Sequence, residues 1–231
     1  MASIIEETAE YQKGNRNGFA KKKYRDGTLE TCMYVDGLRN GLCLVIDNKS
    51  KKNKSETYYI NGIKNGLETV WKEDGIHFER QTMYVNGKKH GLEIMYRHVE
   101  RIESVDGVIN IRIPLEMTET YYENDIKHGT CIIKEDGYVK YYCQYIFDKK
   151  VGNEIVYENN KIVSLKTYNI NGDLDGDCIT YHDNGAVHHV YHYKNNLRHG
   201  YYCAKRPDGT VYEIAHYEYG NIHEIKSRYS N

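Results

Sequence analysis

The chain has 231 residues, of which 39% are hydrophobic, and its 24 tyrosines far outnumber its 3 phenylalanines and 1 tryptophan. With a mean hydropathy of −0.78 it cannot fill a thick apolar core, which argues against a packed two-layer enzyme. Its pI of 6.8 lies below the value of about 9 or more that is typical of proteins binding nucleic acid through phosphates, so a nucleic-acid partner is not expected. Tyrosine buries a ring while its hydroxyl stays hydrated, so the composition favours a thin sheet with rows of tyrosine.

Residues 1–10 precede the first repeated element, and we expect them to form an N-terminal cap or arm. The start, Met1–Ile5, lacks a basic region followed by a sustained apolar segment, which argues against a signal peptide. The chain also has no apolar run of about 18 residues that could span a membrane. We therefore expect a cytoplasmic protein, in the host cytoplasm or virion if it is viral, that is neither secreted nor membrane-spanning.

From residue 11 onward one pattern, Tyr-x-Asn-Gly-x-x-x-Gly, recurs. The clearest copies are residues 34–41, 59–66 and 84–91, and a looser copy is residues 193–200. The second glycines of the copies are Gly18, Gly41, Gly66, Gly91, Gly129, Gly152, Gly176 and Gly200, at intervals of 23, 25, 25, 38, 23, 24 and 24 residues, and the ninth copy has Glu224 where this glycine is due. Copying at a nearly fixed period indicates a tandem array.

Each repeat predicts two tight turns. Asn-Gly and Asp-Gly between apolar residues indicate hairpins, because both residues accept positive φ. Most repeats carry a second such turn about halfway, as at residues 26–27, 74–75 and 136–137. Two turns in ~24 residues leave room for two strands of about five to eight residues. We predict an all-β fold, an elongated single-layer antiparallel meander of hairpin repeats twisted into a trough-like solenoid. Residues 11–225 form nine repeats as one array, and residues 226–231 form a tail.

The second glycine of each repeat lies where a strand begins, so a turn does not explain it. Glycine inside a strand often marks the close approach of another group. We therefore expect this glycine to leave a gap that is covered by the ring of a neighbouring tyrosine.

Positive charge is concentrated in the first repeats. Residues 1–66 hold 12 Lys and Arg against 8 Asp and Glu. A patch that binds anionic lipid would use Lys21, Lys22, Lys23, Lys49, Lys51, Lys52 and Lys54. The alternative, which we favour on the near-neutral pI, is a solvated edge and a soluble loop.

The interval of 38 residues between Gly91 and Gly129 indicates an insertion at about residues 98–114. It reads as a hairpin around Asp106-Gly107, which we expect to lengthen the two strands of its repeat. Insertions in repeat arrays often lie on the binding face. We therefore take Ile109, Ile111 and Ile113, at alternate positions of one strand, as candidate partner-binding residues. The alternative is an extension that folds back on the sheet.

No catalytic, cofactor or metal site is predicted. The sequence lacks nucleotide-binding and metalloprotease motifs. His182, His188, His189 and His192 lie in one repeat, but adjacent residues of a strand point to opposite faces, which argues against a shared metal site. The six cysteines form no C-x-x-C pair, and equivalent cysteines two strands apart would be ~9.6 Å from each other. We expect reduced, unpaired thiols.

The repeats resemble those of MORN-repeat proteins over roughly residues 11–225. They are most similar to the variant repeats of antitoxin-like bacterial and giant-virus proteins, with a Tyr-x-Asn-Gly-x-x-His-Gly core. Where the commoner MORN pattern has a further glycine, two residues after the second, this chain has Ala20, Cys43, Glu68, Glu93, Cys131, Glu154, Cys178 and Tyr202.

The resemblance implies a non-enzymatic repeat scaffold for protein–protein interaction or structural assembly. Two alternatives remain open. One is a peripheral tether to anionic membrane lipid through the basic N-terminal repeats, and the other is an antitoxin-like protein that neutralises a partner toxin. The expected partner is another protein of unspecified identity, and anionic lipid is the less favoured ligand.

Overall fold

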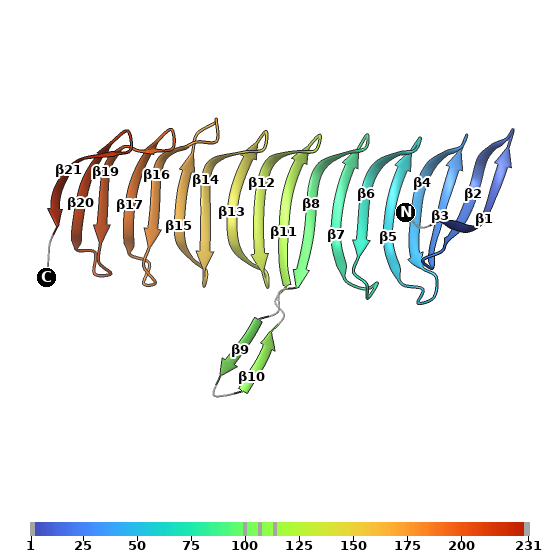
Figure 1. Ribbon diagram of the computed structural model, residues 1–231, viewed down its shortest axis with the longest axis horizontal. Coiled ribbons are helices and arrows are strands. Elements are labelled where there is room, and N and C mark those ends of the chain that lie inside the picture. The colour runs from blue at the N-terminus through green and yellow to red at the C-terminus, as the bar shows by residue number, and fades with distance from the viewer. Residues whose placement is uncertain (1–2, 99–100, 106–107, 113–114, 229–231) are drawn as a thin grey trace. The chain divides into compact units, whose positions relative to one another are not determined.

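The computed structural model describes residues 3–98, 101–105, 108–112 and 115–228. Every regular element in these residues is a β-strand, and strands that follow one another pair antiparallel through short turns (Figure 1). The predicted all-β meander of hairpins is confirmed. Throughout the described part of the chain there is no helix with the length and apolar character needed to cross a membrane.

The chain divides into two compact units, which are described separately. The first contains the described residues within 1–98 together with residues 121–126. Its first eight strands pair consecutively, each of the first seven with the next in sequence. They are β1 (Ile4–Gln12), β2 (Asn15–Tyr24), β3 (Thr28–Val35), β4 (Leu38–Asp47), β5 (Asn53–Ile60), β6 (Ile63–Trp71), β7 (Phe78–Val85) and β8 (Lys88–His98).

The second unit contains the described residues within 99–120 and 127–231. Strand β11 (Leu115–Glu123) lies partly in each unit. The other strands of the second unit are β9 (Arg101–Val105), β10 (Val108–Arg112), β12 (Ile126–Glu135), β13 (Tyr138–Ile146), β14 (Lys149–Glu158), β15 (Lys161–Tyr168), β16 (Leu174–Tyr181), β17 (Val187–Lys194), β18 (Leu197–Arg198), β19 (Gly200–Lys205), β20 (Val211–Glu218) and β21 (Asn221–Arg228).

The insertion forms a small sheet of its own. Strands β9 and β10 pair antiparallel, with Ile109 opposite Ser104 and Ile111 opposite Ile102. Among the described strands these two pair only with each other (Figure 1). The expectation that the insertion lengthens the strands of its repeat was therefore wrong. A short hairpin satisfies its backbone hydrogen bonds internally, so it does not need the register of the strands that flank it.

The core of the first unit is one row of residues that crosses seven strands on one face of the sheet. Each member lies opposite the next in register. This buried row consists of Ala20, Cys32, Cys43, Thr57, Glu68, Thr82 and Glu93, each between 1% and 7% exposed. The second unit buries residues at the same repeat positions, which are Thr120, Cys131, Cys143, Glu154, Cys178, Tyr202 and Ala215. Leu29, Tyr34, Thr69 and Tyr84 of the first unit are also buried, and a core this narrow explains how so polar a chain folds.

The second glycine of each repeat lies in a β-bulge. Tyr59 pairs with Lys64 and Thr57 pairs with Glu68, so residues 65–67 together face Tyr58. Gly66 at the centre of this bulge has a φ of +109°, which side chains other than glycine rarely adopt.

The expected gap for a tyrosine ring is not the reason for this glycine. Gly66 does lie opposite Tyr84 of the next repeat in register. A Cβ added to Gly66 would nevertheless meet the Cβ of Tyr58 at 3.5 Å, which is an ordinary contact. The backbone conformation of the bulge therefore requires glycine.

One of the cysteine expectations was also wrong. Cys32 and Cys43 are joined by a disulfide, with their Cα atoms 4.2 Å apart. They lie directly opposite each other on β3 and β4 of one repeat. The spacing argument compared equivalent cysteines two strands apart and overlooked this cross-strand pair. Cys131, Cys143, Cys178 and Cys203 are free thiols.

Candidate interaction surfaces

A row of cations lies over a row of tyrosines on the face of the buried row. The position two residues before the second glycine holds Lys or Arg in seven of the eight copies that have this glycine. Each of these cations lies over the ring of the tyrosine that opens the next repeat, as Arg39 does over Tyr59 at 5.3 Å and Lys64 over Tyr84 at 4.8 Å. The remaining pairs are Arg16–Tyr34, Lys89–Tyr122, Lys127–Tyr145, Lys150–Tyr168 and Arg198–Tyr217. We call this row the cation–tyrosine ladder.

The same residues join consecutive turns through their backbone. The carbonyl of Arg39 accepts a hydrogen bond of 2.7 Å from the amide of Gly62, and that of Lys64 accepts one of 2.8 Å from Gly87. The Asn61-Gly62 and Asn86-Gly87 turns are thus each hydrogen-bonded to the backbone of the cation of the preceding repeat. A cation–π contact contributes about 0.5–1 kcal/mol at an exposed site, so the ladder gains its strength from repetition.

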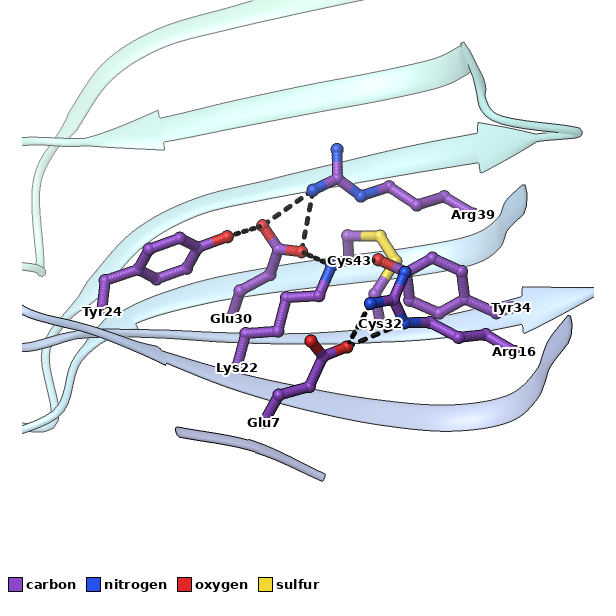
Figure 2. Close-up of polar contacts among 9 residues, drawn as sticks. All are labelled: Glu7, Arg16, Lys22, Tyr24, Glu30, Cys32, Tyr34, Arg39 and Cys43. Atoms are coloured by element: carbon purple, nitrogen blue, oxygen red, sulfur yellow. Dashed lines mark hydrogen bonds and ion pairs between the residues drawn. A yellow bond between two sulfur atoms is a disulfide. The ribbon is translucent and has the colours of Figure 1, made fainter. Parts of the chain in front are cut away.

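Acidic residues of the buried-row face neutralise these cations. Figure 2 shows side chains from three neighbouring strands, β2, β3 and β4, meeting at the carboxylate of Glu30. Its two oxygens accept hydrogen bonds of 2.8 and 2.9 Å from Arg39 Nη2. Tyr24 donates to the same carboxylate at 3.4 Å, and Lys22 Nζ lies 3.8 Å from it. Lys22 also donates a hydrogen bond of 2.8 Å to the Tyr34 hydroxyl. This network is a structural cluster whose charges are paired internally.

Two of the seven lysines predicted to bind anions lie beside carboxylates. Lys22 is only 9% exposed and is held in the Glu30 network. Lys23 lies 3.6 Å from the carboxylate of Glu6. The five exposed lysines are Lys21 on β2, Lys49, Lys51 and Lys52 in the loop after β4, and Lys54 on β5.

The isoleucines predicted to bind a partner lie in the inserted hairpin. Ile109 and Ile111 occupy alternate positions of β10. Ile113 falls outside the described residues.

The opposite face of the first unit carries an apolar surface that sequence reasoning did not single out. Six consecutive strands each expose one large apolar side chain to solvent, and these side chains lie in register across the sheet. This outer apolar stripe consists of Phe19, Met33, Leu42, Tyr58, Leu67 and Met83, each between 38% and 51% exposed. A second apolar row flanks it toward the Asn-Gly turns, formed by Val35, Leu38, Ile60, Ile63 and Val85.

The equivalent positions of the second unit are polar over most of its strands, and Tyr201 on β19 is an exposed exception. Six consecutive strands, β12 to β17, carry Thr130, Gln144, Asn153, Thr167, Asp177 and His192 there. The same fold thus tolerates polar residues at these positions, so the hairpin repeat itself does not require the outer apolar stripe. Exposed apolar patches of this extent mark interaction sites in folded proteins.

Comparison with known families agrees with the repeat geometry. The family model for the MORN repeat matches residues 8–29 and 192–211, one segment near each end of the array. The chain is a MORN-repeat protein. No curated protein matches it.

In this MORN-repeat chain one cluster of histidines departs from strand alternation. Thr180 pairs with His189 and Tyr181 with Val187, so His188 is the extra residue of a β-bulge. The rings of His188 and His189 consequently lie 3.7 Å apart, and that of His182 lies 4.0 Å from His188. The expectation that His188 and His189 point to opposite faces was wrong, because a bulge brings successive side chains to one side.

Two of these histidines, His188 and His189, have lowered pKa values. Burial and the charge of His182 lower the pKa of His188, and burial together with His188 lowers the pKa of His189. His182 Nε2 lies 2.8 Å from the Lys205 carbonyl, to which it donates a hydrogen bond. Within the part of the chain that the structure describes, no three His, Cys, Asp or Glu side chains are grouped so that they could hold a metal ion.

Proposed function

We propose that this MORN-repeat protein is a non-enzymatic scaffold that binds another protein through the outer apolar stripe of its first unit. MORN repeats are in general modules that bind proteins or membranes, and an all-β repeat fold is typically non-catalytic. The observation that carries the proposal is the contrast between the apolar outer row of the first unit and the polar outer row of the second. Since the fold does not need the apolar row, binding is the physical reason for retaining it.

The chemistry of the partner follows from what borders the stripe. Lys21 lies on β2 two positions beyond Phe19, on the same face, and Lys54 lies four positions before Tyr58 on β5. Both lysines are exposed. Apolar side chains with lysines at one margin match a protein segment that carries apolar side chains and acidic residues, because opposite charges fix the register of an apolar contact. A toxin neutralised by this chain would be one partner of this kind.

Substitution of the stripe by charge tests the proposal. We expect the double variant Leu42→Lys with Leu67→Lys to lose capture of its partner from the native source by at least about tenfold, as expected for two central apolar contacts. Both side chains are about half exposed, at 51% and 46%, so the melting temperature should change little. The matched control, Thr130→Lys with Asn153→Lys, places the same charges at the equivalent positions of the second unit, directly after Gly129 and Gly152, and should bind normally. Equal binding by both double variants would contradict the proposal.

A vesicle sedimentation assay distinguishes the protein-binding scaffold from the peripheral lipid tether. Vesicles containing anionic lipid should not sediment the wild-type protein. Sedimentation that is lost at raised salt would instead favour the lipid tether through the exposed lysines.

Deletion of residues 99–112 tests the inserted hairpin as the binding site. Because β9 and β10 pair only with each other among the described strands, the deletion should leave both units folded. The stripe proposal predicts that the deleted protein still captures the partner. Loss of capture without loss of folding would move the site to the inserted hairpin that carries Ile109 and Ile111.

A further inference from the structure

Two thiols of the second unit face each other across neighbouring strands. Cys131 on β12 lies directly opposite Cys143 on β13. Both are free, and they are only 7% and 1% exposed. Directly opposed residues of an antiparallel pair have Cα atoms about 4.5–5.5 Å apart, which lies within the range of about 4.4–6.8 Å that a disulfide requires.

The first unit contains the same arrangement in its bonded form. Cys32 and Cys43 are opposed on neighbouring strands of the buried row and are joined by a disulfide. The two other free cysteines of the chain have no cysteine opposite them. Cys178 faces Lys166 and Tyr191, and Cys203 faces Val190 and Ile214. The fold therefore accommodates a cystine in this row, and the second unit supplies one matched pair for it.

The surroundings of the pair assign different roles to its two sulfur atoms. A hydrogen bond from the Cys143 thiol lowers the pKa of Cys131, with further contributions from Thr120 and from the charges of Lys127 and Lys150. Thr120 Oγ1 lies 3.6 Å from Cys131 Sγ. The same shared proton raises the pKa of Cys143. Cys131 is thus the more easily ionised and less buried thiol, and thiolate is the form that reacts with oxidants.

We propose that Cys131 and Cys143 are a site of peroxide oxidation, at which a cross-strand disulfide forms between β12 and β13. The Cys131 thiolate attacks one oxygen of hydrogen peroxide, the O–O bond breaks, and the released hydroxide takes up a proton to become water. Cys131 is then a sulfenic acid, oxidised by two electrons. The Cys143 sulfur, losing its proton, attacks the Cys131 sulfur and displaces hydroxide, which becomes the second water. Two thiols and one peroxide thus give one disulfide and two waters.

The test uses the full-length protein, fully reduced and then freed of reductant. After treatment with hydrogen peroxide the remaining thiols are alkylated under denaturing conditions, and unreduced peptides are analysed by mass spectrometry. We expect a linked Cys131–Cys143 peptide that lacks two hydrogen atoms, while Cys178 is alkylated. In the Cys143→Ala variant a trapping reagent for sulfenic acid should label Cys131. Because Cys143 is deeply buried, the less buried Cys131→Ser variant provides a second sample, in which Cys143 should stay a thiol.

The disulfide also has a physical consequence that can be measured. Since it closes a loop of about a dozen residues, it should raise the melting temperature of the oxidised protein by a few degrees, and the Cys131→Ser variant should lack this shift. Recovery of both thiols in alkylated form, while Cys32 and Cys43 form their linked peptide in the same sample, would overturn the proposal. So would linkage of Cys131 or Cys143 to Cys178 or Cys203 as often as to each other. The proposal does not depend on the scaffold function.

Discussion

Replacement of Glu68 by alanine should lower the free energy of unfolding by about 2 kcal/mol, because it removes the acceptor of a buried network. Glu68 is 6% exposed and accepts hydrogen bonds from Lys64 at 2.5 Å and from Arg80 at 3.1 Å. Both cations keep about a third of their side-chain surface exposed and can rehydrate. The cost is for this reason below the ~3–5 kcal/mol of a fully buried pair.

Denaturant unfolding of the variant and of a matched control checks this value. Glu79 lies one strand away and is exposed, so the Glu79→Ala variant should stay within about 0.5 kcal/mol of the wild type. If Glu68→Ala and Glu79→Ala unfold at the same denaturant concentration, the carboxylate network does not stabilise the sheet.

The pH dependence of this effect has a definite sign. Burial by itself would raise the pKa of Glu68, but the hydrogen bond from Lys64 and the charges of Lys64 and Arg80 outweigh it, so its pKa is lowered. A carboxylate with a lowered pKa in the folded state stabilises the protein above its unfolded pKa of about 4.3. This contribution is lost as the pH falls through the folded pKa. The difference between wild type and Glu68→Ala should accordingly shrink in acid.

The Gly91→Val variant should be destabilised by about 2 kcal/mol through backbone strain alone. Gly91 has a φ of +91°, and a Cβ added there would lie 3.7 Å from the Cβ of Met83. A distance of 3.7 Å is an ordinary van der Waals contact. The expected loss of stability therefore comes from the backbone conformation of the bulge and not from a steric clash. Asparagine accepts positive φ more readily than valine, and Gly91→Asn should lose less stability.

Thermal melting of the two variants distinguishes the causes. A loss for valine that clearly exceeds the loss for asparagine supports backbone strain as the origin. Equal losses would point to filled space, and an unchanged melting temperature for Gly91→Val would show that the bulge does not need its glycine.

The repeat period is what made the fold predictable from sequence. The Asn-Gly and Asp-Gly pairs mark the turns and therefore the strands, and the regular spacing of the second glycines identified a tandem array, so an all-β meander could be predicted without any measured contact. The sequence analysis did not single out the cation–tyrosine ladder, although Lys64 and Lys89 occupy the same repeat position. The cation–π contacts themselves could not be predicted, because strand register decides which tyrosine of the next repeat lies beside each cation.

Departures from regularity were the parts that sequence reasoning missed. A bulge at His188 reverses the alternation rule locally, and the bulge around Gly66 gives that glycine a conformational role. The Cys32–Cys43 disulfide depends on which residues face each other across a hairpin, a matter of register that residue spacing alone did not reveal. The outer apolar stripe was hidden for another reason, because strand alternation does not tell which of two faces is covered.

Site-specific photo-cross-linking in the native source tests the binding face most directly. A photoreactive amino acid is placed at Tyr58, in the outer apolar stripe of the first unit, and separately at Thr167, at the equivalent outer position of the second unit. We predict that illumination yields a cross-linked protein partner from Tyr58 and none from Thr167. A partner cross-linked through Thr167 but not through Tyr58 would contradict the assignment of the outer apolar stripe as the binding surface.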